Sequence, residues 1–316
     1  MTMRARAPAK LNLSLRVLGK RPDGYHDIET LFERIDLCDE LLLEPHPHAL
    51  QLTCTDPALS CGEDNLILQS ARLLQQAGGA SPGASIHLIK RIPVAAGLGG
   101  GSSDAAAALR GLNRLWQLGL TQAQLIELGA RIGSDVPFFL DETSPFAVGT
   151  GRGEQCRALV GALRLAHVLV VPDARLSTKD IYEGFDGHLA QRPFTNTPRP
   201  LAGRFDLTAP KPSIIISQHA LCNGSLGELA RGLWNDLEPE AIRRCPVIAS
   251  IKTRLHALGC LAACLSGSGP SVFGVCRDEP QAREIAATLQ REHHDPAWRI
   301  ELVQTDRLQP TTVHAP

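Results

Sequence analysis

Several features that mark common protein classes are scarce in this sequence. Aromatic residues make up only 4% of the 316 residues, and the formal net charge at pH 7 is −1. With few rings to stack on bases and no overall positive charge, the chain lacks the features of a nucleic-acid-binding protein or of a protein held at an anionic membrane surface. Any site for an anionic ligand must therefore be local.

Cysteine and histidine lack the spacings that bind metals. The nine cysteines include no Cys-x-x-Cys pair, and the eleven histidines include no His-x-x-x-His pair. This pattern argues against a structural zinc site and is typical of reduced thiols. No apolar run is long enough to cross a bilayer, and the first residues lack the apolar stretch of a signal peptide. We therefore expect a cytoplasmic protein.

The order of predicted elements indicates a chain of two domains with mixed α and β structure. Strands are expected at residues 10–18, 40–44, 84–93 and 164–171, and helices at residues 65–77, 104–118 and 121–133. The later part of the chain predicts an α+β second domain. Its expected elements are helices at 225–244 and 247–258, two strands around a turn at 267–270, a helix from 278 and a strand around 298–302. The sequence changes character after Gly153, so we place the domains at 1–155 and 156–316. The proline-rich stretch 187–212 is expected to be a surface excursion.

A glycine-rich loop joins a predicted strand to a predicted helix. Its sequence is Gly97-Leu-Gly-Gly-Gly-Ser-Ser103, with Ser102 or Ser103 available as the helix N-cap. Small residues let backbone N–H groups surround phosphate oxygens, and the helix dipole favours their negative charge. The loop lacks the lysine of a Walker A motif, and it does not fit the dinucleotide fingerprint. The loop is therefore either a flexible turn or a phosphate site of another class of nucleotide-binding protein.

The segment Pro93-Val-Ala-Ala-Gly-Leu-Gly-Gly-Gly-Ser-Ser-Asp-Ala-Ala-Ala-Ala-Leu109 resembles the phosphate-binding motif of the GHMP kinases. Its long Gly-Leu-Gly-Gly-Gly-Ser-Ser form is similar to one branch of that family, which phosphorylates a cytidine diphosphate-linked methylerythritol. Further segments that resemble this branch cover most of the chain: Pro8–Leu13, Arg21–His26, Glu63–Ile67, Gly133–Phe138, Asn235–Leu237 and Ser266–Phe273.

The resemblance implies a fold, a reaction and a nucleotide site. The implied fold is α+β, with a ribosomal-protein-like N-terminal domain that binds ATP, a ferredoxin-like C-terminal domain and a cleft between them. The implied cofactors are ATP and Mg²⁺, and the implied partner is a small-molecule acceptor. The implied ATP-binding residues are Pro93, Val94, Ala95, Ala96, Gly97, Leu98, Gly99, Gly100, Gly101, Ser102, Ser103 and Asn65. On local grounds Asn65 is only a helix N-cap candidate.

Two charged residues are the candidate catalytic groups. Asp135 follows the predicted helix stop at Gly133, where a carboxylate either caps the next helix or faces a cleft. Lys10 lies in an alternating strand, where its ammonium group either reaches solvent or pairs with an anion. The resemblance implies that Asp135 takes the proton of the acceptor hydroxyl and that Lys10 pairs with it.

Four residues are candidates for the acceptor site. Asn12 lies on the same strand face as Lys10, two residues further on. Tyr25 and His26 follow the turn Pro22-Asp-Gly24; they are either ordinary boundary residues or, as the resemblance implies, contacts to cytosine by stacking and hydrogen bonding. Tyr182 is a candidate for the other face of the base.

Two other functions remain open at this point. One is a GHMP kinase that acts on homoserine, mevalonate or a sugar. The other is a non-catalytic RNA-binding module, because the N-terminal domain of the family resembles a ribosomal-protein fold. The low net charge and the scarcity of aromatic residues argue against the second.

Overall fold

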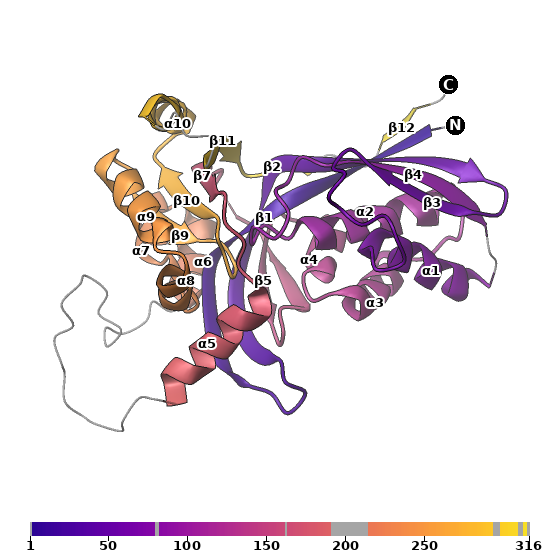
Figure 1. The fold of residues 1–316 in the computed structure, drawn as a ribbon, viewed down its shortest axis with the longest axis horizontal. Helices are drawn as coiled ribbons and strands as arrows, with labels where there is room; N and C mark the ends of the chain where they lie inside the picture. Colours follow the sequence, from indigo (N-terminus) through magenta and orange to yellow (C-terminus); the bar gives the residue numbers. More distant parts are fainter. Residues whose placement is uncertain are drawn as a thin grey trace.

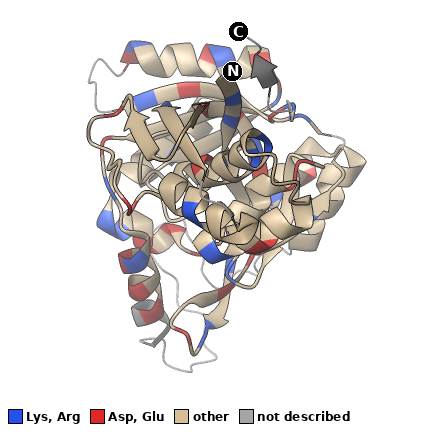
Figure 2. Cartoon of the chain, turned by 90° about the vertical axis from the view of Figure 1, so that its right-hand side faces the viewer, with Lys and Arg blue, Asp and Glu red and all other residues tan. Residues whose placement is uncertain are grey.

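The computed structural model describes residues 2–79, 82–161, 163–190, 214–292, 298–308 and 312–314. These residues form two sheets with helices packed on them, and the two sheets lie side by side (Figure 1). Basic and acidic positions are interspersed along the described chain (Figure 2).

The first sheet is built around one long antiparallel hairpin. Its strands β1 (Thr2–Lys20) and β2 (His26–His46) pair along almost their whole length, with shifts of register after Pro8, Asn12 and Val17. The sheet order is β12 (Thr312–His314), β1, β2, β4 (Gly83–Ile89) and β3 (Leu50–Cys54). Three more strands join this sheet: β5 (Phe146–Thr150) pairs with β2 and with β6 (Gln155–Leu159), and β8 (Trp234–Asn235) pairs with β1.

Four helices cover one face of this sheet (Figure 1). They are α1 (Leu66–Gly78), α2 (Gly100–Leu115), α3 (Gln122–Ile132) and α4 (Val136–Leu140). The run Ala105–Ala108 in α2 is fully buried, and these small side chains let the helix lie close against the sheet. The start of α2 is thereby held in a fixed place at the edge of the core.

The second sheet has the order β11 (Trp298–Gln304), β7 (Ala166–Pro172), β10 (Val272–Cys276) and β9 (Ala262–Leu265), and all its pairs are antiparallel. The helices of this half are α5 (Thr178–Ala190), α6 (Ile214–Asn223), α7 (Leu226–Arg231), α8 (Glu238–Arg244), α9 (Val247–Ala257) and α10 (Glu279–Glu292). An apolar cluster that includes Ile248, Val170 and Ile285 joins α9 and α10 to the sheet.

A further apolar cluster joins the two sheets to each other. It includes Leu11 and Leu31 from the long hairpin and Leu169 and Phe273 from the second sheet. Strands β8 and β12 come from the second half of the sequence, yet both pair with β1. The division at residue 155 falls at the start of β6, inside the β5–β6 hairpin, and it stays a prediction.

The structure confirms the helices predicted at 65–77, 121–133 and 247–258, including the capping box of Thr121 and Gln124. The strand predicted at 40–44 lies near the end of the much longer β2. Its earlier part was not predicted, because polar residues interrupt the apolar pattern there. Helix α2 begins at Gly100 instead of Asp104, so its N-cap is Gly99 and not Ser102 or Ser103. Gly99 makes the entering turn with a φ of 69°, and the next two glycines continue as helix.

The helix predicted at 225–244 is wrong. Helix α7 ends at Arg231 with Gly232 as its C-cap, the chain then runs extended through β8, and α8 starts with Pro239 in its first turn. The sequence analysis did not predict α6, which is apolar on most sides and lacks amphipathic periodicity. Of the predicted excursion at 187–212, residues 187–190 belong to α5, and the remainder lies outside the described residues.

Candidate active site

A cleft of about 930 Å³ lies where the two sheets meet. Its walls come from β1, the β1–β2 turn, the glycine-rich loop, the start of α4 and helix α5. Among the predicted site residues, those that line the cleft are Lys10, Asn12, Tyr25, His26, Asn65, Pro93, Val94, Ala95, Ala96, Gly97, Leu98, Gly99, Gly100, Gly101, Ser102, Asp135 and Tyr182. Ser103 does not line it, and its hydroxyl is buried without a hydrogen-bond partner among the described residues.

The glycine-rich loop leads directly into the first turn of α2. The first backbone N–H groups of a helix have no partner within the helix, and here they belong to Gly100, Gly101 and Ser102, all of which line the cleft. Their free donors and the positive end of the helix dipole make this corner suitable for phosphate oxygens. The geometry therefore supports the phosphate site that the sequence predicts.

The second half of the chain holds this loop in place. Gly97 has a φ of 77°, and its carbonyl oxygen accepts a hydrogen bond of 3.0 Å from the hydroxyl of Ser266. A Cβ atom on Gly97 would collide with the carbonyl oxygen of Ser266. Ser271 N–H also donates to the carbonyl of Ala96. The turn between β9 and β10 is thus a direct support of the phosphate loop.

Lys10 and Asp135 form an ion pair inside the cleft. The Nζ atom of Lys10 lies 3.7 Å from Oδ2 of Asp135, and the lysine side chain is only 5% exposed. Burial lowers the pKa of Lys10, and the charge of Asp135 partly opposes that shift. The backbone N–H of Lys10 donates to the carbonyl of Leu98, which ties this strand to the phosphate loop. The ammonium group therefore lies beside both the carboxylate and the phosphate corner.

The Asp135 side chain does not serve as a cap for the helix that follows it. It stands at the N-cap position of α4, but its carboxylate makes no capping hydrogen bond. Among the two readings of this residue, the geometry favours the one in which the carboxylate faces the cleft. With one quarter of its side chain exposed, it is open to a ligand.

Asn12 fixes the lysine from the other side. Its side-chain oxygen accepts a hydrogen bond from Nζ of Lys10, and its amide donates to the hydroxyl of Thr30 at 2.8 Å. Both side chains point to the same face of β1, as their spacing predicts. With its amide and oxygen already engaged, Asn12 holds Lys10 in a defined position.

Tyr25 and His26 line the cleft where the β1–β2 turn leads into β2. Tyr25 is 58% exposed, and the guanidinium group of Arg152 lies 5.0 Å from the centre of its ring. The buried ring of His26 stacks on Tyr182 with 4.8 Å between ring centres. The structure thus brings the three predicted base-binding residues to one region and adds Arg152, which the sequence analysis missed.

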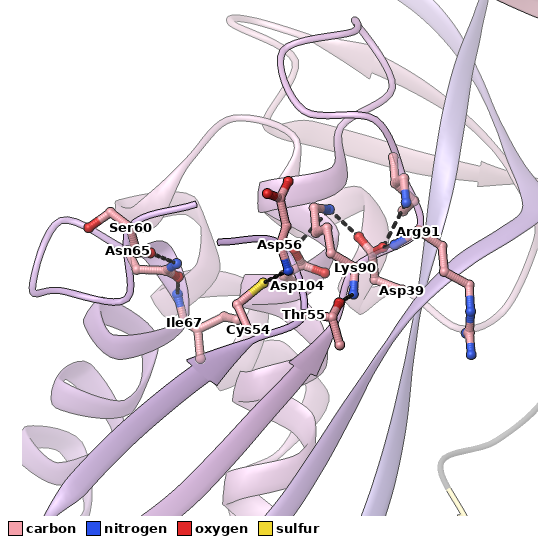
Figure 3. A network of polar contacts seen from close by, with 11 residues as sticks. Asp39, Cys54, Thr55, Asp56, Ser60, Asn65, Ile67, Lys90, Arg91 and Asp104 are labelled. Carbon is pink, nitrogen blue, oxygen red and sulfur yellow. Dashed lines mark hydrogen bonds and ion pairs between the residues drawn. The ribbon is translucent and has the colours of Figure 1, made fainter. Parts of the chain in front are cut away.

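A network of charged residues that the sequence analysis missed adjoins the cleft, and two of its members, Lys90 and Asp104, line it (Figure 3). The buried ammonium of Lys90 pairs with Asp39 and lies 3.3 Å from Asp104. Burial raises the pKa of Asp104 to about 8; Lys90 opposes this shift and Asp39 adds to it. Lys90 lies three residues before the loop segment, directly after β4, and it lines the cleft, so a lysine within the predicted strand 84–93 was the available signal.

Asn65 acts as the N-cap of α1, as its local sequence suggests. Its side-chain oxygen accepts from the N–H of Ile67 at 3.0 Å, and its amide donates to the carbonyl of Ser60 (Figure 3). It lines the cleft at the same time. Both readings of Asn65 are therefore compatible with its position, and its contact with a nucleotide stays a prediction.

Within the described part of the chain, no three histidine, cysteine, aspartate or glutamate side chains converge to hold a metal ion. The same residues contain no helix that is long and apolar enough to cross a membrane.

Comparison with known proteins gives consistent matches along the chain. The model of the GHMP kinases N terminal domain matches residues 65–142, and that of the GHMP kinases C terminal domain matches residues 217–295. A 4-diphosphocytidyl-2-C-methyl-D-erythritol kinase of Pelotomaculum thermopropionicum is 41% identical over 292 residues, which cover 92% of this chain and 95% of that protein.

Solved structures agree with these sequence matches. A crystal structure of 4-(cytidine 5'-diphospho)-2C-methyl-D-erythritol kinase superimposes with a TM-score of 0.73 at 33% identity, covering 96% of this chain and 98% of the other. Homoserine kinase of Cytophaga hutchinsonii has a TM-score of 0.70 at 19% identity and covers 96% and 94% of the two chains, so it shares the fold alone. The predicted two-domain α+β kinase fold is confirmed. The chain belongs to the GHMP kinase family, in the branch of the 4-diphosphocytidyl-2-C-methyl-D-erythritol kinases.

Proposed function

We propose that this protein transfers the γ-phosphoryl group of ATP to the 2-hydroxyl group of 4-diphosphocytidyl-2-C-methyl-D-erythritol. The observation that carries the proposal is the ion pair of Lys10 and Asp135, which lies between a phosphate-binding loop and a turn that bears Tyr25 and His26. Relatives that bear the name of this kinase support the choice of acceptor.

Asp135 is the proposed general base. A hydroxyl group becomes a better nucleophile as a positioned carboxylate takes its proton during attack on phosphorus. The carboxylate of Asp135 faces the cleft and makes no capping bond, so it is available for that contact. Direct transfer to the acceptor needs no phosphorylated enzyme.

Lys10 is the proposed electrostatic partner. Its ammonium group pairs with Asp135 and would offset the negative charge that develops between the acceptor oxygen and the γ-phosphate. Asn12 holds the ammonium group in place through its side-chain oxygen. Because the pair is mostly buried, its charges interact more strongly than they would in water.

The nucleotide would lie with its phosphates on the segment from Gly97 to Ser102, because Ser103 is buried and does not line the cleft. The N–H groups at the start of α2 would donate to phosphate oxygens, and Asn65 and Lys90 would lie near the rest of the nucleotide. Ser102 lines the cleft at this corner, and its hydroxyl would contact a Mg²⁺ ion held mainly by phosphates and water, which fits the scarcity of protein ligands among the described residues. Bound there, the ion would neutralise charge on the β- and γ-phosphates.

The cytosine end of the acceptor would lie at Tyr25, His26 and Tyr182. A pyrimidine can stack on the exposed Tyr25 ring and hydrogen-bond to the imidazole, while the diphosphate and polyol extend toward Asp135. The proposed partner is thus a small molecule, and we propose a cytoplasmic location.

A coupled assay of ADP release tests the proposal. Purified protein should release ADP with the cytidylylated methylerythritol and only negligibly with methylerythritol phosphate, homoserine or mevalonate. Equal turnover of free methylerythritol phosphate would show that the cytidine group is not recognised, and turnover of homoserine or mevalonate alone would place the chain with another acceptor.

A further inference from the structure

An aspartate of α5 contacts the end of the β1–β2 hairpin next to the turn. Lys20 and His26 are direct partners in the antiparallel pairing of β1 with β2. Both side chains meet Asp186: Nε2 of His26 lies 2.7 Å from Oδ1, and Nζ of Lys20 lies 2.8 Å from Oδ2. The two carboxylate oxygens of Asp186 are therefore each engaged by a different residue of one cross-strand pair.

The ring of His26 is fixed in orientation by two residues of the same helix face. Tyr182 and Asp186 are four residues apart on α5 and therefore neighbours on its surface. Tyr182 stacks on the ring, and Asp186 contacts its Nε2 atom. Among the described residues, none is recorded in a hydrogen bond to Nδ1 of His26, although the side chain lines the cleft.

The chemistry of the carboxylate decides which ring nitrogen carries the proton. Burial of Asp186 opposes its ionisation, but hydrogen bonds from Lys20 and His26 outweigh burial and lower the pKa of this carboxyl. An ionised carboxylate only accepts hydrogen bonds, so Nε2 of His26 must be the donor. In the neutral ring, Nδ1 is then left as an acceptor.

We propose that Asp186 is a positioning residue that determines base specificity: it holds His26 as the Nε2–H tautomer, so that Nδ1 accepts a hydrogen bond from the exocyclic amino group of cytosine. This inference rests on the proposed function, because it concerns the base of the same acceptor. Asp186 acts through His26 and has no direct contact with the substrate.

The tautomer separates cytosine from uracil. Cytosine presents an amino donor where uracil presents a carbonyl oxygen, which is an acceptor. An acceptor at Nδ1 can form a hydrogen bond with the amino group of cytosine. With uracil, two acceptors would face each other with no proton between them. The site should therefore discriminate strongly against uracil, because Nδ1 and the uracil oxygen would both be removed from water without gaining a hydrogen bond.

Asp186→Asn should exchange the donor and acceptor roles of the two ring nitrogens of His26, with almost no change in side-chain volume. The ammonium group of Lys20 needs an acceptor, so the new amide should turn its oxygen to Lys20 and its NH₂ group to Nε2 of His26. Nε2 must then accept, and the proton moves to Nδ1, which becomes a donor suited to the carbonyl oxygen of uracil. The ratio of kcat/KM for the cytidine acceptor to kcat/KM for its uridine analogue should fall at least about tenfold.

Glu183→Gln is the matched control. It removes the same charge from the same helix, three residues away, at a cleft-lining side chain that contacts Lys179 instead of His26. This variant should keep the wild-type ratio. An unchanged ratio in Asp186→Asn, or an equal fall in Glu183→Gln, would overturn the inference, since neither outcome is compatible with a proton placed by Asp186.

A direct measurement separates this inference from the proposed function. Long-range ¹H–¹⁵N correlation spectra distinguish the ring tautomers, and His26→Gln identifies the signals of His26. We expect Nε2–H in the wild type and Nδ1–H in Asp186→Asn. A wild-type signal from Nδ1–H or from a doubly protonated ring overturns the inference even if the cytidylylated acceptor is turned over. If that acceptor is not turned over by the wild type, the proposed function fails instead, whatever the spectra show.

Discussion

Nε2 of His167 on β7 lies 2.8 Å from Oε2 of Glu33 on β2, and both side chains are fully buried. This contact joins the second sheet to the first. The other oxygen of Glu33 accepts a hydrogen bond of 2.7 Å from the hydroxyl of Thr305. Since the cleft lies where the two sheets meet, the Glu33–His167 contact fixes the frame in which the site is assembled.

Removal of Glu33 should therefore destabilise the whole chain. Glu33→Ala leaves a buried polar atom of His167 and the buried hydroxyl donor of Thr305 without their partner, and each such loss costs about 1–3 kcal/mol. Urea unfolding would measure the loss. Glu301→Ala breaks an exposed pair with Arg299 and should cost less than about 1 kcal/mol. Similar losses in the two variants would contradict a special role for Glu33.

Substitution of Asp135 should affect chemistry much more than nucleotide binding. Asp135→Asn keeps the size of the side chain but removes the base, so kcat should fall by about 100-fold or more, the scale of general-base catalysis. Asp141→Asn makes the same change at the other end of α4, where the carboxylate contacts Thr143, and should leave kcat within about threefold of wild type.

The Asp135 experiment combines steady-state kinetics with nucleotide titration. The dissociation constant for ATP should change little in Asp135→Asn, because the phosphate loop lies on other elements. Near-normal turnover would remove Asp135 from the role of base. Parallel loss of ATP binding would indicate a structural role in its place.

Gly97 should tolerate no side chain. Gly97→Ala places a Cβ against the carbonyl of Ser266 and forces an alanine into a left-handed conformation, which together should cost more than about 2 kcal/mol and weaken ATP binding. Gly101→Ala is the control in the same loop: it lies in helix, and its Cβ would meet only Leu66, at 3.7 Å. Thermal unfolding should therefore separate the two variants by several degrees. Equal melting temperatures would show that the β9–β10 turn can move away from the loop.

The sequence was informative where one local pattern decides the structure. The capping box at Thr121 and the N-cap at Asn65 were each readable within a few residues, and the glycine-rich loop was correctly placed before α2, although the helix starts at Gly100 and not at Asp104. The order of motifs along the chain was enough to predict the two-domain kinase fold. These features depend on local backbone chemistry or on family resemblance, and neither requires knowledge of distant contacts.

The parts that escaped prediction depend on distant partners. Glu33 and Arg34 are buried charged residues, and the groups that pair with them, His167 and the carbonyl of Phe138, lie more than 100 residues away in sequence. Asp186 was missed for the same reason, since His26 is 160 residues away. Polarity in one segment cannot reveal a partner in another, so such buried networks emerge only when the chain is folded.

Lys10 should give the enzyme an alkaline limit of activity. Burial lowers the pKa of Lys10 below the 10.5 of an ordinary lysine, and Asp135 opposes but does not cancel this shift, so the ammonium group loses its proton at a lower pH than a surface lysine. The charged form stabilises the transferring phosphoryl group, so kcat should fall as pH rises through that pKa. Lys10→Arg keeps a charge throughout this range and should lower kcat but remove the alkaline fall, whereas the surface variant Lys179→Arg should keep the wild-type profile. An alkaline fall that persists unchanged in Lys10→Arg would assign it to another group.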